Sequence, residues 1–231
     1  MKNLLFKIFA PLTFGLALCQ PAVATTTLAD LINSNGNIVV GDLVFSNFAY
    51  SFTGEMAPAD SINVLTLSNA NGTEGIRFQG AFLDLYDGDG VSTGTGSDAF
   101  ISYTVSVLDP GTDGITEAHL AANTLLLGDG PGIVSITETF LPEAPGASMN
   151  VFDVKPGSTN LIDWVSFDGL LTSINVQKDI AGLAAALGSV ATISFIDQTY
   201  KTTEVPEPAS AALLLSGLIA GGRIRRKKVA A

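Results

Sequence analysis

Residues 100–108, Phe-Ile-Ser-Tyr-Thr-Val-Ser-Val-Leu, form the stretch that decides the fold class of this chain. Most of these residues are β-branched or aromatic, which favours a pleated, half-buried strand over a helix. Residues 133–140 and 190–196 have the same character, and residues 62–67 alternate apolar with polar side chains. Turn residues such as Asn71-Gly72 separate these stretches, so the pattern indicates strands joined by short turns.

Further stretches extend this pattern along the chain. The other expected strands are residues 37–40, 43–45, 76–85, 151–154, 161–167 and 174–177. About ten strands without a repeat of fixed length predict an all-β fold, an antiparallel β-sandwich or jelly roll. Two segments depart from it: residues 28–32 predict one helical turn, and residues 180–187 predict a helix because Ala and Leu dominate there. Residues 120–127 fit a helix or a strand.

The first 24 residues have the features of a secretory signal peptide. Lys2 and Lys7 lie beside an apolar run, Ile8 to Cys19, which is too short for an ordinary membrane span. Ala22-Val23-Ala24 then supplies the small-x-small pattern that signal peptidase recognises. We therefore expect signal peptidase to act here and the mature protein to begin at or near Thr25.

The stretch from Thr25 to Pro208 is strongly acidic. It holds all 22 acidic residues of the chain but only four basic ones, so its formal charge is −18. Such a body repels phosphate backbones, which argues against nucleic acid as a partner. It also repels anionic polysaccharides and membrane surfaces unless divalent cations bridge the two. Because the single cysteine, Cys19, precedes the expected cleavage point, the mature core has to be stable without a disulfide.

The last 27 residues combine three features in a distinctive order. Pro206-Glu207-Pro208 is followed by fourteen uncharged residues, 209–222, and then by five cations. As a helix the uncharged run would be roughly 21 Å long, shorter than the roughly 30 Å hydrocarbon core of a bilayer. It predicts a marginal membrane anchor that its cations hold on the cytoplasmic side. These cations are Arg223, Arg225, Arg226, Lys227 and Lys228.

This order of motif, apolar helix and basic cluster resembles the PEP-CTERM sorting signal of Gram-negative bacteria. The resemblance covers residues 205–231 and implies recognition by exosortase, a membrane-embedded cysteine protease, with processing near the motif. It further implies transient anchoring in the inner membrane, followed by delivery to the cell surface or the extracellular matrix. The chain then divides into a signal peptide (1–24), a β-sandwich body (25–204) and a sorting tail (205–231).

The densest acidic loop is a candidate calcium site. It contains Asp84, Asp87 and Asp89 and continues to Asp98, with glycines between them. Clustered carboxylates in a flexible loop suit calcium, which accepts six to eight oxygen ligands in adaptable geometry. The loop departs from an EF-hand, because Val91 occupies the fifth position counted from Asp87. Asp and Gly are also the residues that hairpin turns prefer, so an ordinary turn is the alternative.

No catalytic constellation stands out, and we expect a protein that is not an enzyme and uses no cofactor other than the candidate calcium. His119 is the sole histidine and is expected to be structural or solvent-facing, since no Gly-x-Ser-x-Gly elbow accompanies it. Trp164 is the sole tryptophan. Its neighbours Ile162, Val165 and Phe167 are apolar, so Trp164 is expected to pack in the core.

These features favour a structural or adhesive role in the cell envelope or the exopolysaccharide matrix. A carbohydrate-binding module is the alternative, and exposed aromatic side chains on one sheet face would distinguish it. A secreted hydrolase is a further alternative, and two carboxylates facing each other across a cleft would distinguish that one.

Replacement of Pro206, Glu207 and Pro208 by alanines tests the sorting assignment. Export should continue because the signal peptide is intact, but the protein should accumulate in the inner membrane because its anchor is no longer recognised for removal. Cell fractionation measures the distribution, and a triple-alanine variant that fractionates like the natural protein would contradict the assignment.

Overall fold

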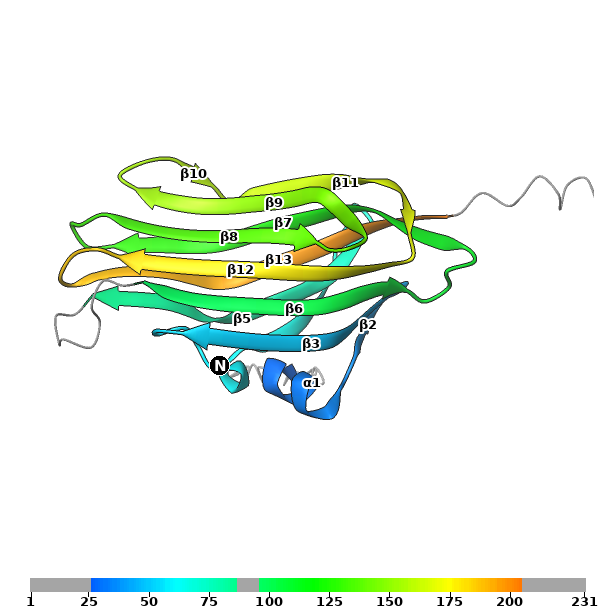
Figure 1. Cartoon of the computed structure of the whole chain (residues 1–231), viewed down its shortest axis with the longest axis horizontal. Coiled ribbons are helices and arrows are strands. Elements are labelled where there is room, and N and C mark those ends of the chain that lie inside the picture. Colours follow the sequence, from blue (N-terminus) through cyan, green and yellow to red (C-terminus); the bar gives the residue numbers. More distant parts are fainter. Residues whose placement is uncertain (1–25, 87–95, 205–231) are drawn as a thin grey trace, which may run out of the picture.

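The computed structural model describes residues 26–86 and 96–204, and these form two antiparallel β-sheets (Figure 1). The predicted antiparallel all-β fold is therefore confirmed. The six-stranded sheet has the order β1-β4-β5-β13-β7-β11, and the seven-stranded sheet has the order β10-β9-β8-β12-β6-β3-β2. The elements are β1 (Thr26–Thr27), α1 (Leu28–Ser34), β2 (Ile38–Val40), β3 (Leu43–Thr53), the 3-10 helix η1 (Ala59–Ser61), β4 (Asn63–Ser68), β5 (Thr73–Tyr86), β6 (Ser97–Val107), β7 (Asp113–Leu127), β8 (Gly132–Phe140), β9 (Ala144–Lys155), β10 (Thr159–Asn160), β11 (Ile162–Leu171), β12 (Ser173–Ala184) and β13 (Ser189–Glu204).

Helix α1 confirms the helical turn that the sequence predicts at residues 28–32. Thr27 caps its first turn: the backbone N–H of Asp30 donates to Thr27 Oγ1 at 3.1 Å, and Asp30 Oδ2 accepts from the Thr27 N–H at 3.3 Å. Asn35 ends the helix in the left-handed conformation, with φ of 48°. Within residues 26–86 and 96–204, no helix has the length and apolarity needed to cross a membrane.

The helix predicted at residues 180–187 is wrong, because β12 continues to Ala184. Ile180 and Ala184 point into the core, whereas Ala181 between them is exposed, which is the alternation of a strand. β12 lies between β6 and β8 and pairs with both, so the two ladders override the helix propensity of Ala and Leu. Residues 120–127, which the sequence left open, are the end of β7.

The last two strands occupy the middle of the two sheets. β12 lies between β8 and β6 in the seven-stranded sheet, and β13 lies between β5 and β7 in the six-stranded one. Figure 1 shows these long strands running along the longest axis of the molecule. Each sheet is therefore completed only by strands from the C-terminal part of the body.

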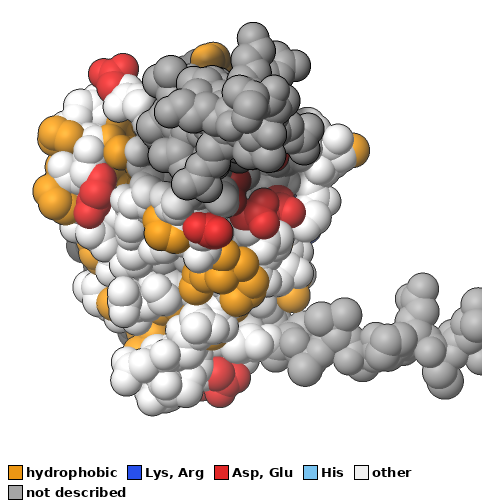
Figure 2. Space-filling view, turned by 90° about the vertical axis from the view of Figure 1, so that its right-hand side faces the viewer, with side chains coloured by type: hydrophobic (Ala, Val, Ile, Leu, Met, Phe, Trp, Pro, Cys, Tyr) orange, Lys and Arg blue, Asp and Glu red, His pale blue; other side chains and the backbone are white. Residues whose placement is uncertain are grey.

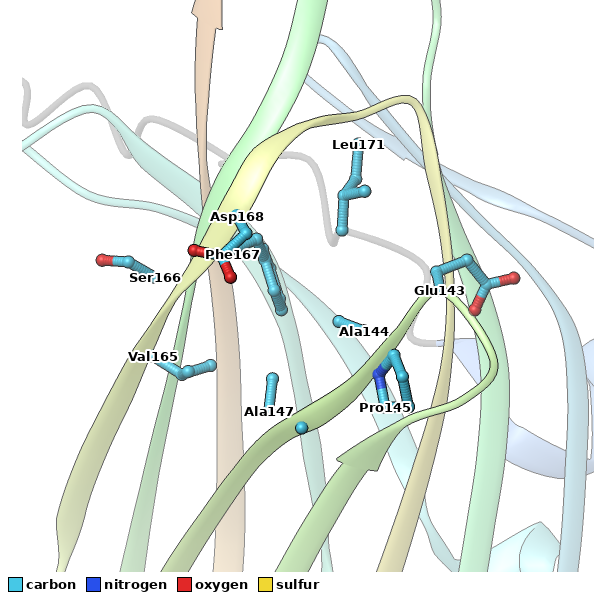
Figure 3. Close-up of a pocket in the computed structure, with 10 residues that line it drawn as sticks. Glu143, Ala144, Pro145, Ala147, Val165, Ser166, Phe167, Asp168 and Leu171 are labelled. Atoms are coloured by element: carbon cyan, nitrogen blue, oxygen red, sulfur yellow. The ribbon is translucent and has the colours of Figure 1, made fainter.

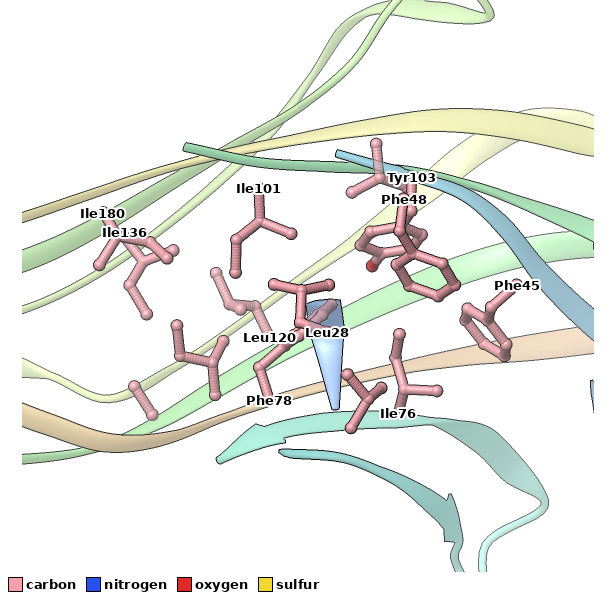
Figure 4. Packing of buried hydrophobic residues seen from close by; sticks show 14 of the residues in the cluster. Leu28, Phe45, Phe48, Ile76, Phe78, Ile101, Tyr103, Leu120, Ile136 and Ile180 are labelled. Atoms are coloured by element: carbon pink, nitrogen blue, oxygen red, sulfur yellow. The ribbon is translucent and has the colours of Figure 1, made fainter. Parts of the chain in front are cut away.

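Aromatic side chains from both sheets meet in one core (Figure 4). Tyr103 on β6 and Tyr200 on β13 join the sheets through a hydrogen bond of 2.9 Å between their hydroxyls. The ring of Phe45 lies 6.1 Å from that of Tyr103 and 6.0 Å from that of Tyr200, centroid to centroid. Because each hydroxyl is buried, this mutual hydrogen bond offsets part of the cost of removing it from water.

Three polar side chains are fully enclosed in the same core. Lys178 on β12, Glu138 on β8 and Gln198 on β13 are each 0 % exposed. The Lys178 ammonium contacts Glu138 Oε2 and Gln198 Oε1, so the cluster spans both sheets. Burial raises the pKa of Glu138 and lowers the pKa of Lys178, and in each case it outweighs the opposing effect of the partner's charge.

Substitution of Gly75 by alanine tests the close approach of β5 to β13. An added Cβ would lie 1.9 Å from the Gln198 carbonyl oxygen and 2.6 Å from Thr199 Cα, and neither backbone atom can turn away as a side chain could. Gly75→Ala should lower the free energy of unfolding by about 1–3 kcal/mol or more through overpacking. Gly146→Ala is the matched control, because no heavy atom lies within 4 Å of its added Cβ. Chemical denaturation measures both, and equal stability of the two variants would contradict this packing.

Candidate functional site

The outer face of the six-stranded sheet carries an exposed indole. Trp164 lies on the edge strand β11 and is 60 % exposed, so the prediction that it packs in the core is wrong. The reason is the alternation along β11, which turns Val165 and Phe167 inward and Trp164 outward. Trp164 pairs in register with His119 on β7, and the two rings stack with centroids 6.4 Å apart and planes 23° apart.

His119 belongs to a small charged group beside this indole. Its Nε2 lies 3.3 Å from Glu117 Oε2, without the alignment of a hydrogen bond. On the other side, Lys201 Nζ donates to Glu117 Oε1 at 3.3 Å. The His119 side chain is 31 % exposed and faces solvent, and its ring supports one face of the Trp164 indole.

A second planar group lies farther across the same face. Arg77 on β5 and Asp197 on β13 are register partners and form a two-pronged pair, with Nε to Oδ1 at 2.5 Å and Nη2 to Oδ2 at 2.7 Å. The guanidinium carbon of Arg77 lies 3.9 Å from the centre of the Phe195 ring. Three strand spacings separate β5 from β11 and two separate β13 from β11, so the backbones of Arg77 and Asp197 lie about 14 Å and about 10 Å from the Trp164 strand.

Small side chains lie between Trp164 and the Arg77–Asp197 pair. Ala121 on β7 is the register partner of both Asp197 and the exposed Ile162. Asn123 completes the polar rim, and its Nδ2 donates to Ser194 Oγ at 2.8 Å. The face therefore combines an apolar stacking surface with planar hydrogen-bonding groups on rigid strands, an arrangement that can hold a flat polyhydroxylated ligand.

A cleft of about 420 Å³ lies between β9 and β11, on the inner side of the strand that carries Trp164 (Figure 3). Its walls include Ala147, Val165 and Phe167, and both Glu143 and Asp168 line it. Glu143 accepts hydrogen bonds from the Asn175 backbone N–H at 3.1 Å and from its Nδ2 at 2.7 Å. In Figure 3 the Glu143 carboxylate points away from Asp168, so the two carboxylates do not face each other across the cleft.

The structure separates the two candidate calcium ligands that it describes. Asp84 is buried, and its carboxylate accepts from Ser97 Oγ at 2.7 Å and from the Ala184 N–H at 2.6 Å. Asp98 points to the opposite, solvent face of β6, where partial burial and then the neighbouring Asp179 raise its pKa. Asp87 and Asp89 lie outside the described residues, and the described part of the chain gathers no three metal-ligating side chains.

The other predicted site residues also lie outside the described range. They are Ala22 and Ala24 of the signal cleavage site, Pro206, Glu207 and Pro208 of the sorting motif, and the basic cluster from Arg223 to Lys228.

Sequence reasoning missed the Arg77–Asp197 pair and the buried Lys178–Glu138 pair. The sequence does indicate that Lys178 is buried, because Lys178 takes a position between Val176 and Ile180 that the alternation of the strand reserves for apolar residues. No local pattern in the sequence indicates the Arg77–Asp197 pair, since its members are 120 positions apart in the chain.

Comparison with known proteins assigns the chain to no family. No protein-family model matches the chain, and no curated protein matches it. Among solved structures, it is similar to the structure described as TmCBM61 in complex with β-1,4-galactotriose, with 10 % sequence identity and a TM-score of 0.26. The match covers 68 % of this chain and 88 % of the other.

Proposed function

We propose that this chain is an exported adhesive protein of the cell surface or extracellular matrix, whose β body binds a neutral polysaccharide. The binding surface is the outer face of the six-stranded sheet. The observation that carries the proposal is the 60 % exposed Trp164, stacked on His119 at the edge of a face that also presents polar groups. An exposed aromatic on one sheet face is the feature that favours a carbohydrate-binding role over a purely structural one.

Stacking explains why an indole suits such a ligand. The axial C–H groups of a pyranose ring make one face of the sugar apolar, and an exposed indole offers a flat apolar surface of similar size. The stacked His119 ring limits rotation of the Trp164 side chain, so less side-chain entropy is lost on binding. Ile162, 69 % exposed and two residues away on the same face of β11, extends the apolar surface along the strand.

The charge of the face favours a neutral ligand. Asp197 pairs with Arg77, and Glu117 pairs with Lys201, so the cations of this face are already neutralised. The body as a whole carries a formal charge of −18 and repels anionic polymers. The paired groups keep hydrogen-bonding capacity, which suits the hydroxyls of a neutral sugar. Figure 2 shows further acidic side chains at one end of the molecule, in keeping with the negative charge of the body.

The two ends of the chain support delivery to the place where such a polymer is found. The signal peptide provides export, and the tail that begins at Pro206-Glu207-Pro208 resembles a sorting signal for the cell surface. An exported protein that is sorted in this way meets exopolysaccharide directly.

Trp164 also provides the test, because it is the only tryptophan of the chain. Titration of the purified protein with neutral oligosaccharides should change its intrinsic fluorescence, since a stacked sugar displaces water from the indole. In affinity electrophoresis, gels that contain the polysaccharide should retard the natural protein but not Trp164→Ala. Loss of one stacking residue should weaken binding roughly tenfold or more, about 1.4 kcal/mol.

Phe100→Ala is the matched control for this experiment. Phe100 is an exposed aromatic, 38 % exposed, but it lies on β6 of the seven-stranded sheet. Its removal should leave binding unchanged. Equal retardation of the natural protein and Trp164→Ala on every neutral polysaccharide tried, or equal loss in both variants, would overturn the assignment of this face.

A further inference from the structure

The enclosed cluster of Lys178, Glu138 and Gln198 joins three central strands. Lys178 on β12 and Glu138 on β8 are register partners within one sheet. Gln198 reaches the same point from β13 of the opposite sheet. Apolar side chains such as Ile136 and Val176, each 0 % exposed, precede these residues on the inward faces of β8 and β12.

The cluster leaves two buried polar atoms unsatisfied. Glu138 Oε1 and Gln198 Nε2 have no hydrogen-bond partner among the described residues. The Tyr200 hydroxyl lies near the Gln198 amide, but Nε2 completes no hydrogen bond of ordinary geometry with it. Buried unsatisfied polar atoms are rare and costly, and two in one cluster call for a physical explanation.

The three groups also form a complete reacting set. An amine is a nucleophile, a carboxamide is an acyl donor, and a carboxyl group can carry protons between them. Lys178 Nζ contacts Gln198 Oε1, which is bonded to the acyl carbon Cδ, so nucleophile and electrophile are adjacent. Burial lowers the pKa of Lys178 and raises that of Glu138, which makes transfer of a proton from Nζ to the carboxylate easier.

We propose that Lys178 and Gln198 join in an intramolecular isopeptide bond, with Glu138 moving the protons. The Nζ lone pair attacks Gln198 Cδ, and the carbonyl π electrons move to Oε1. Glu138, which already carries the first proton from Nζ, delivers it to Nε2 and then takes a second proton from Nζ. When the carbonyl re-forms, the Cδ–Nε2 bond breaks and ammonia leaves. One C–N bond forms, one breaks, and no oxidant or reductant is needed.

This bond accounts for the unsatisfied amide nitrogen of Gln198 and for the amine enclosed in the core. The unsatisfied Nε2 atom of Gln198 is the one that departs, and the product amide leaves no amine to be charged in the core. The bond would link β12 and β13, the strands in the middle of the two sheets. The mature chain has no cysteine for a disulfide, and this cross-link would restrict the unfolded ensemble as a disulfide does.

Mass spectrometry of the purified natural protein tests the proposal. The mass should be lower than the sequence mass of the processed chain by one ammonia, about 17 Da. After chymotrypsin digestion, a peptide that contains Gln198 should be recovered joined to a peptide that contains Lys178. A mass without this loss, or separate peptides for the two residues, would overturn the proposal. A loss of water with a Lys178–Glu138 link would also overturn it, since Glu138 would then be the acyl donor.

Variants separate the cross-link from ordinary packing. Glu138→Gln keeps the shape of the side chain but cannot relay the protons, so the folded protein recovered from this variant should show no loss of mass. Gln198→Leu removes the acyl donor and should also keep its full mass. Lys201→Met is the matched control, because Lys201 is an exposed lysine on the same strand as Gln198 and should leave the loss intact. A cross-link that persists in Glu138→Gln would contradict the role given to Glu138.

Discussion

The contact between Lys178 and Glu138, enclosed with Gln198 inside the core, is the constraint on which the rest of the structure depends. Enclosing the nitrogen of Lys178 and the carboxyl group of Glu138 away from water is costly, and the contact between them offsets this only while the geometry is kept. Side chains alternate along a strand, so a slip of one residue would turn Lys178 to the solvent and leave Glu138 unpaired. The cluster thereby fixes the relative register of β8, β12 and β13.

The same cluster explains how a body with so few cations is organised. All four of its basic residues are held in place: Lys178 by Glu138, Arg77 by Asp197, Lys201 by Glu117, and Lys155 by the Gly128 carbonyl. The remaining carboxylates are mostly at the surface and repel one another, an effect that salt screens. Cohesion must come from the interior, where aromatic packing and the Tyr103–Tyr200 hydrogen bond join the two sheets.

The sequence was sufficient for the fold class but not for which side chains are buried. Turn-bounded runs of β-branched residues predicted antiparallel strands, because that signal is local. At residues 180–187 the composition predicted a helix, but pairing of β12 with strands on both sides makes most of this segment a strand. Trp164 was misplaced because apolar residues stand in both phases of the strand, Ile162 and Trp164 in one and Val165 and Phe167 in the other. The Arg77–Asp197 pair depends on the pairing of β5 with β13, which no local pattern encodes.

The buried cluster and the outer face are two sides of one strand. Gln198 and Tyr200 point from β13 into the core. Asp197, on the same strand, points outward to Arg77 on β5. Fixing β13 from the inside therefore also fixes the spacing of the polar groups on the outer face. Paired strands position such side chains more precisely than loops do. A face held in this way is largely preformed. It suits a ligand that presents the same flat surface at each repeat, as a polysaccharide does, better than one that has to be enclosed.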